Sequence, residues 1–119
     1  MLSRSLPSLA RCVDVAIPSL PQPVKFTIGQ RASDHHPMLD AAKPSDLWFH
    51  LDGGLASAHI IASVPDGASR TQIKAIIAHG ARLSKELSKH GNRVSVMHTR
   101  VRNVSKTDVE GQVIVRPGS

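Results

Sequence analysis

The chain has 119 residues, enough for a single domain with one hydrophobic core. It carries a formal net charge of +6, and only 3% of its residues are Phe, Trp or Tyr, so the core must be mainly aliphatic. The positive charge favours polyanionic partners, because each neutralised phosphate releases condensed counterions. The single cysteine, Cys12, excludes an internal disulfide and a cysteine-based zinc site, and it fits a reducing compartment such as the cytoplasm. No apolar run approaches the ~20 residues of a membrane span.

Residues 1–11 contain two arginines, three serines and no acidic residue. This composition is typical of a mitochondrial presequence, although the segment is short and Pro7 would interrupt a helix. We expect residues 1–11 to be either a flexible leader or a targeting segment, and residues 12–119 to form one domain. The expected location is cytoplasmic, with a mitochondrial location left open by the leader.

The first part of the domain is predicted to contain two strands. Residues 12–17 and 24–28 are rich in β-branched side chains, and three prolines separate them. The stretch 30–45 is polar, and we expect it to be irregular, with one helical turn at most around residues 38–42.

A β-hairpin is predicted next. Residues 46–52 alternate between the two faces of a strand, so Trp48 and His50 share one face. Two glycines supply a turn, and residues 58–64 return as a second strand, antiparallel to the first. This pairing would place His50 and His59 opposite each other.

One long helix is predicted from about residue 70 to residue 90. Ser69 and Gln72 form a capping-box pattern at its start, and Gly91 is a typical C-terminal stop. Its apolar residues recur at helical spacing: Ile73, Ile76, Ile77, Gly80, Leu83 and Leu87.

Residues 93–104 and 112–116 have strand character, with a polar turn at 106–111 between them. Strands therefore precede and follow a single long helix. This order predicts an α+β fold, with a mostly antiparallel β-sheet and one long amphipathic helix packed on one face.

Two basic clusters are the main candidates for a binding surface. The helix carries a basic ridge on its polar face, consisting of Arg70, Lys74, Arg82, Lys85 and Lys89, and Glu86 is its only acidic residue. A second cluster follows the helix and consists of Arg93, Arg100, Arg102 and Lys106. Arg100 and Arg102 would point to the same side of a strand. These nine residues are the expected nucleic-acid contacts; the alternative is an ordinary solvated face.

Metal and catalytic sites are not expected. His35 and His36, or His50 and His59 with Asp34, Asp46 or Asp52 nearby, could be considered as metal ligands, but no helical His-x-x-x-His pattern supports this. Ser57 near His59 lacks a nucleophile-elbow motif, and no phosphate-binding loop is present. We expect no enzyme activity, no cofactor, no bound metal and no small-molecule substrate.

Three segments resemble the signatures of the NFACT-R domain, the presumed RNA-binding module of the NFACT proteins of ribosome-associated quality control. The first is Ala42-x-Pro44-x-Asp46-Leu47-Trp48-Phe49-His50, and the second is Ser57-Ala58-His59-Ile60-Ile61. The third is a Val-rich strand ending at Thr99, then the basic segment 102–106 and a last strand after Gly111. The resemblance covers residues 13–115 and is greatest to the short, stand-alone type. It implies an α+β fold and makes Asp46, Trp48, Phe49, His50, Ser57 and His59 signature residues.

The chain departs from the family pattern where His35-His36 replace a common Asn-Asp pair, and we expect none of the other NFACT domains within these 119 residues. Charge and resemblance together predict a non-catalytic nucleic-acid-binding domain, with RNA favoured over DNA and a link to the ribosome. The alternatives are a protein-interaction module that docks on a ribosomal or other acidic partner, or a DNA-binding domain.

Overall fold

We describe the computed structural model of the chain over residues 10–52, 58–89 and 93–116. Its centre is a five-stranded antiparallel sheet with the strand order β1-β2-β4-β3-β5. The strands are β1 (Arg11–Val15), β2 (Val24–Gly29), β3 (Leu47–Leu51), β4 (His59–Ala62) and β5 (Val96–Arg100). The predicted hairpin is confirmed, because β3 and β4 pair antiparallel.

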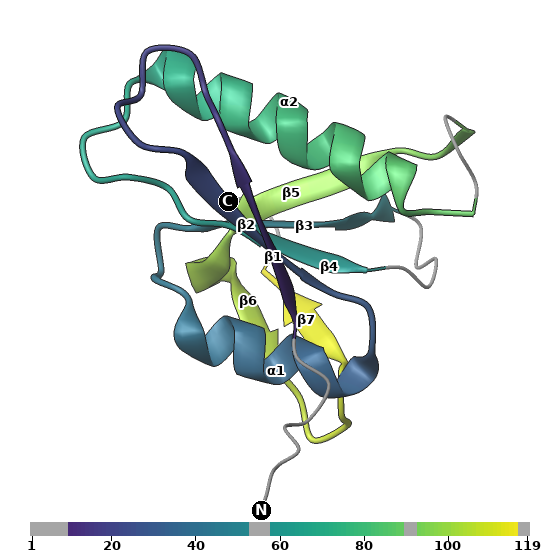
Figure 1. Cartoon of the computed structure of the whole chain (residues 1–119). Coiled ribbons are helices and arrows are strands. Elements are labelled where there is room, and N and C mark those ends of the chain that lie inside the picture. Colours follow the sequence, from purple (N-terminus) through teal and green to yellow (C-terminus); the bar gives the residue numbers. More distant parts are fainter. Residues whose placement is uncertain (1–9, 53–57, 90–92, 117–119) are drawn as a thin grey trace, which may run out of the picture.

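Each face of the sheet is covered by different elements (Figure 1). Helix α2 (Arg70–Glu86) packs on one face. Helix α1 (Ala32–Ala41) and a separate two-stranded sheet of β6 (Val104–Lys106) and β7 (Val113–Val115) lie on the other. The predicted α+β class, with its antiparallel sheet and long helix on one face, is therefore confirmed. No helix in the described ranges is long and apolar enough to cross a membrane.

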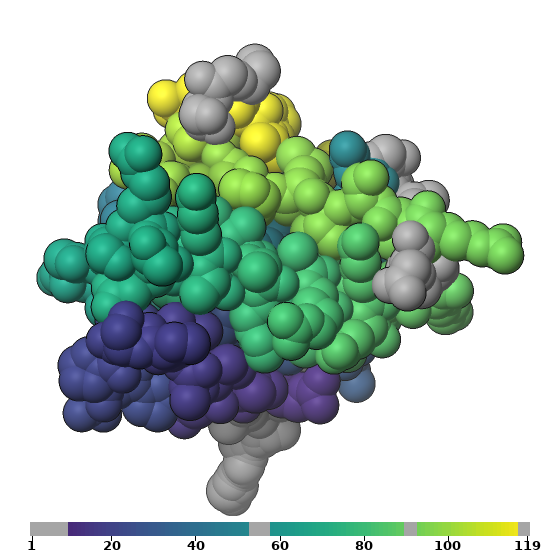
Figure 2. Space-filling view, turned by 90° about the horizontal axis from the view of Figure 1, so that it is seen from above, coloured from purple at the N-terminus to yellow at the C-terminus, as the bar shows by residue number. Residues whose placement is uncertain are grey.

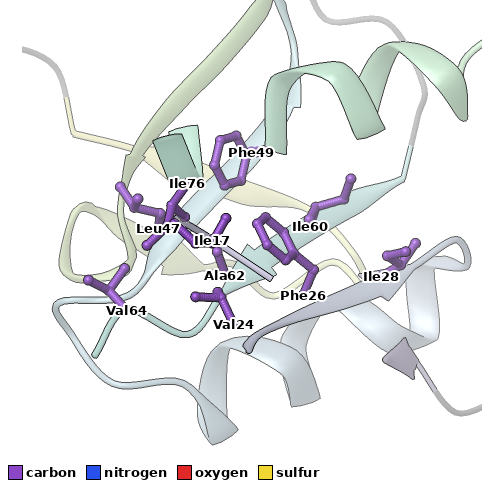
Figure 3. Packing of buried hydrophobic residues seen from close by; sticks show 10 residues of the cluster. All are labelled: Ile17, Val24, Phe26, Ile28, Leu47, Phe49, Ile60, Ala62, Val64 and Ile76. Carbon is purple, nitrogen blue, oxygen red and sulfur yellow. The ribbon is translucent and has the colours of Figure 1, made fainter. Parts of the chain in front are cut away.

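The larger part of the core lies between the sheet and α2 (Figure 3). Phe26 and Phe49 are fully buried there and contribute most of its aromatic volume. Gly80 of α2 lies against the Phe49 ring so closely that a Cβ would be only 2.6 Å from Phe49 Cε1. The predicted capping box is present: the Gln72 backbone N–H donates to Ser69 Oγ at 3.1 Å, and the Ser69 N–H donates to Gln72 Oε1 at 2.8 Å.

The prediction that residues 30–45 are irregular is wrong. They contain α1, whose start is held by the Asp34 carboxylate, which accepts a hydrogen bond from the Arg31 N–H at 3.1 Å. Pro37 lies inside this helix and removes one of its backbone hydrogen bonds. The helix was missed because two of its four buried residues, Asp34 and His35, are polar, so no apolar stripe is visible in the sequence.

The predicted strand character of residues 93–104 is confirmed only in part. Strand β5 ends at Arg100, a 3-10 turn occupies Val101–Asn103, and β6 begins on the other side of it. The turn is held by backbone hydrogen bonds from Val101 N–H to the Asp46 carbonyl (2.8 Å) and from Arg102 N–H to the Pro44 carbonyl (3.0 Å). Because these partners are distant in sequence, strand propensity alone gave no sign of the break.

Three predicted features lie outside the described residues: the glycine stop of the long helix, the two-glycine turn and Ser57. Helix α2 ends at Glu86, four residues before the predicted end, and residues 90–92 with the proposed glycine stop are not among those described. The same holds for the two-glycine turn and for Ser57.

Candidate binding surfaces

Four residues of the basic ridge lie on the outer side of α2, and the fifth, Lys89, follows the end of the helix. Arg70, Lys74, Arg82 and Lys89 are exposed and Lys85 is half-buried. Within the described parts of the chain, none of the five forms an ion pair. Figure 2 views this face and shows the segment that contains β5 running beside the helix. The ridge therefore presents uncompensated positive charge along one surface.

A groove of about 380 Å³ separates α2 from β5. Leu47, Ile73 and Ile77 supply its apolar lining. Arg100 and Arg102 line it as well, because the 3-10 turn after Arg100 keeps both arginines beside the helix. Both arginines therefore lie on the same side, as expected, but the 3-10 turn places them there and not the alternation of a strand.

The second basic cluster does not form a single surface. Lys106 lies on β6, on the side of the sheet opposite α2, and its ammonium donates to Asp40 Oδ1 of α1 at 2.6 Å. Arg93 is exposed ahead of β5, at the other end of that strand from Arg100. The groove therefore joins only Arg100 and Arg102 to the helix.

Asp46, the first residue of the signature segment, is buried and holds backbone segments together. Its Oδ2 accepts a hydrogen bond from the Lys43 N–H at 2.9 Å, and its Oδ1 accepts one from the Val64 N–H at 3.0 Å. The carboxylate thus connects the approach to β3 with the exit from β4. Phe49, from the same segment, lies in the α2 core.

Trp48, His50 and His59 gather on the other face of the sheet, together with His35 from α1. The His35 and His59 rings stack with centroids 3.4 Å apart, and the Trp48 and His50 rings stack at 5.6 Å. The His59 ring stands perpendicular to both His50 (4.6 Å) and Trp48 (5.4 Å). We call this set the Trp–His cluster: two parallel ring pairs that meet at a right angle. His50 and His59 face each other in this cluster, as predicted.

Burial controls the protonation of two histidines of this cluster, His50 and His59. Desolvation, with smaller contributions from the neighbouring histidines, lowers the pKa of His59 from 6.5 to about 3. Burial also lowers the pKa of His50, although its hydrogen bond to the Leu51 carbonyl opposes the shift. Since His50 Nδ1 faces that carbonyl at 2.8 Å, this nitrogen must carry the proton. Both rings are therefore neutral at pH 7.

Two polar atoms of the cluster are buried without a hydrogen-bond partner among the described residues, namely Trp48 Nε1 and His59 Nδ1. A cavity of about 640 Å³ lies beside the cluster. Its apolar wall comes mainly from Leu51, Met97, Val113 and Val115, and the remaining wall comes from the cluster itself, from Ala32 of α1 and from the turn between β6 and β7. Sequence reasoning missed these wall residues, because β6 and β7 were not expected to fold over this face.

The two α1 histidines hold the same turn in place. His36 Nε2 donates to the Gln112 carbonyl at 2.9 Å, and His35 Nδ1 lies 3.4 Å from the Gly111 carbonyl. Gly111 has a positive φ of 79° and lies close to Ala32, where a side chain would collide with α1. No group of three or more His, Cys, Asp or Glu residues in the described ranges is arranged to hold a metal ion.

Comparison with known proteins identifies the fold. No protein-family model matches the chain, and no curated protein matches it significantly. Among solved structures, the C-terminal part of the fibronectin/fibrinogen-binding protein from Streptococcus suis is similar, with a TM-score of 0.69 and 20% sequence identity over 97% of this chain. The chain spans 43% of the length of that structure. At this level of identity the similarity establishes a shared fold.

Proposed function

We propose that the chain is a non-catalytic protein-interaction module that docks on an acidic surface of a partner through α2 and β5. The main observation behind this proposal is the groove, in which Ile73, Ile77 and Leu47 lie beside the side chains of Arg100 and Arg102. Such a combination suits an acidic segment with apolar anchors, because the apolar residues supply affinity and the cations supply orientation and association rate. The name of the structural neighbour, which describes a protein that binds other proteins, is consistent with this role.

The positions of the aromatic residues favour a protein over a single-stranded nucleic acid. Recognition of single strands relies on bases that stack on exposed aromatic side chains. Phe26, Trp48 and Phe49 are all at most 2% exposed, and the chain has no tyrosine. The α2 face therefore offers cations without a Phe, Tyr or Trp stacking platform.

Nucleic acid is the second candidate partner, with RNA favoured over DNA. The basic ridge would contact phosphates, and the resemblance of the Asp46–His50 segment to the NFACT-R signature supports RNA and a link to the ribosome. A backbone-directed contact of this kind needs no stacking platform. It would use the same face as the proposed protein partner, so one set of variants tests both.

The test compares two triple variants that each lose three positive charges. Lys74→Ala/Arg82→Ala/Lys85→Ala alters the ridge, and Lys25→Ala/Arg31→Ala/Arg116→Ala alters exposed cations away from α2. Binding is measured by fluorescence anisotropy with a labelled acidic peptide containing Glu and Leu, and with short single- and double-stranded RNA and DNA. We expect the ridge variant to weaken peptide binding several-fold and the control variant to leave it unchanged. Equal effects of the two variants would refute a specific surface.

The salt dependence separates the two partners. If phosphates occupy the ridge, the slope of log K against log salt falls in the ridge variant by about 0.7 to 0.9 for each lost contact. Tight nucleic-acid binding with this change, and no peptide binding, would replace the protein-interaction proposal with the nucleic-acid one.

A further inference from the structure

Strand β5 is one of the two outer strands of the five-stranded sheet, because within the described residues it pairs only with β3. The pairing is regular, and its register continues without a bulge from Leu47 opposite Arg100 to Leu51 opposite Val96. The sequence of β5 contains neither proline nor lysine, two residues that commonly block the outer edge of a sheet. The outer edge of β5 therefore has the form that accepts a further strand.

Two hydrogen bonds show which backbone groups face this outer edge. The Asp52 N–H donates to the Ser95 carbonyl, and the Val101 N–H donates to the Asp46 carbonyl, both at 2.8 Å. Residues of an antiparallel strand bond to their neighbour in alternation, so the odd-numbered residues of β5 bond to β3. The even-numbered residues, with His98 at the centre, must direct their N–H and C=O groups away from β3.

The outer edge of β5 is accessible beside α2. His98 is exposed and lines the groove, and Figure 2 shows the segment that contains β5 running along the helix at the surface. Outside the regular helices and strands, no backbone hydrogen bond of the described residues involves Val96 or His98. When an extended peptide adds to such an edge, its main-chain hydrogen bonds give affinity and the adjoining side-chain pockets give specificity.

The charges around the edge indicate an acidic occupant. The Arg100 guanidinium lines the groove and donates to the Ser45 carbonyl at 2.5 Å, and its further N–H donors suit a carboxylate. Arg102 lies beside it, and Arg93 is exposed ahead of β5. None of the described residues that line the groove is Asp or Glu. A second copy of the chain would bring like charges together, which is unfavourable between neighbouring strands.

We propose that β5 binds an extended acidic segment of a partner protein as an additional strand of the sheet. The backbone of this segment exchanges hydrogen bonds with the even-numbered residues of β5. Alternate side chains of the segment face α2, where an apolar one contacts Ile73 and Ile77 and a carboxylate pairs with Arg100. The inference rests on the proposed function, because it takes the same partner and specifies how that partner binds.

Peptides with a methylated backbone test strand addition without altering the protein. The parent is the labelled acidic peptide, with Leu and Glu in strict alternation, and its binding to the full chain is measured by fluorescence anisotropy. Two derivatives carry N-methyl groups at every second residue, one at the odd and the other at the even positions. A bound strand turns only one of these sets toward β5, so one derivative should bind at least about tenfold more weakly than the other. Equal affinities of the two derivatives would overturn strand addition.

Amide hydrogen exchange of β5 gives a second readout. We expect saturating parent peptide to slow exchange of the His98 N–H at least about tenfold and to leave Met97 and Thr99, which face β3, unchanged. Unchanged exchange at His98 in the complex would contradict the proposal. A slow His98 N–H in the peptide-free chain, together with a dimeric mass by light scattering, would assign the edge to a second copy and overturn the proposal as well.

Two substitutions at one position test the same hydrogen bond from the side of the protein. His98→Pro removes the outward N–H and keeps the bonds to β3, because residue 98 does not donate to that strand. His98→Val removes the imidazole and keeps the N–H. We expect the proline variant to bind the parent peptide at least about tenfold more weakly and the valine variant to bind it normally, with circular dichroism confirming both folds. Equal binding by two folded variants would count against strand addition; the methylated peptides decide the question if His98→Pro does not fold.

The ridge variant distinguishes failure of strand addition from failure of the docking surface. Peptide binding that is weakened by Lys74→Ala/Arg82→Ala/Lys85→Ala but responds equally to both methylation patterns would overturn strand addition and retain the docking surface. Absence of any peptide binding would overturn both proposals.

Discussion

The lowered pKa of His59 makes stability depend on pH in a defined direction. In the unfolded chain His59 takes up a proton near its ordinary pKa of 6.5, whereas in the folded protein it does so only near pH 3. Between these values the unfolded state binds more protons, so the free energy of unfolding falls as the pH is lowered. The contribution is complete above about pH 6.5 and is lost progressively toward pH 3.

The size of the effect follows from the shift. Each pH unit within the window changes the free energy of unfolding by about 1.4 kcal/mol for one titrating group. Between pH 7 and pH 5 this gives a loss of roughly 2 kcal/mol from His59 alone. That is a substantial part of the stability of a small domain, about 5–15 kcal/mol.

Urea unfolding of the wild type and of His59→Phe at pH 7 and pH 5 measures this contribution. Other groups titrate in both proteins, so the comparison between them isolates His59. We expect the wild type to lose roughly 2 kcal/mol more than the variant between the two pH values. A constant difference between the two proteins would refute the argument, because it would mean that His59 titrates alike in the folded and unfolded states.

Three further substitutions test the packing, each by urea unfolding at pH 7. Gly80→Ala should destabilise the protein by roughly 1–2 kcal/mol. The collision of the new Cβ with the buried Phe49 ring outweighs the gain of about 1 kcal/mol in helix propensity. A more stable variant would show that the ring can move aside. Asp46→Ala should cost roughly 2 kcal/mol or more, since the Lys43 and Val64 N–H groups lose their acceptor; a loss under about 0.5 kcal/mol would mean that water replaces the carboxylate. Ser69→Ala should cost about 1 kcal/mol through loss of the helix cap, and an unchanged stability would show that the capping box is dispensable.

Local patterns were sufficient for the side of the molecule that contains α2. The helix stripe, its capping box and the alternation of β3 are each visible within a few consecutive residues, and they place Ile76 and Phe49 in one core. The exposed cations of α2 follow from the same periodicity, because residues off the apolar stripe must face solvent. The ridge could therefore be predicted from the sequence.

The opposite side depends on contacts between distant residues and could not be predicted in this way. Helix α1 has a mixed polar and apolar buried face, and it is positioned by hydrogen bonds from His36 to the Gln112 carbonyl of the β6–β7 turn and from His35 to the Gly29 carbonyl of β2. The break after Arg100 likewise depends on carbonyls of residues 44 and 46. From the sequence alone, two histidines were expected to face each other across a hairpin. The residues that form the cavity wall around them could not be predicted.

Strand β3 links the two sides, and its alternation explains why one short segment contributes to both. Phe49 faces the α2 core and Leu47 lines the groove beside α2, whereas Trp48 and His50 face the cavity. Residues of such a strand are constrained on both faces, so a distinctive sequence there can reflect packing, binding or both.

Asp46 and Phe49 are explained by packing, because their polar and apolar contacts are all internal. Trp48 and His59 are not fully explained by packing, since each retains an unpartnered buried nitrogen among the described residues. Both nitrogens are enclosed, so a ligand in the cavity cannot bind them while the cluster keeps this arrangement.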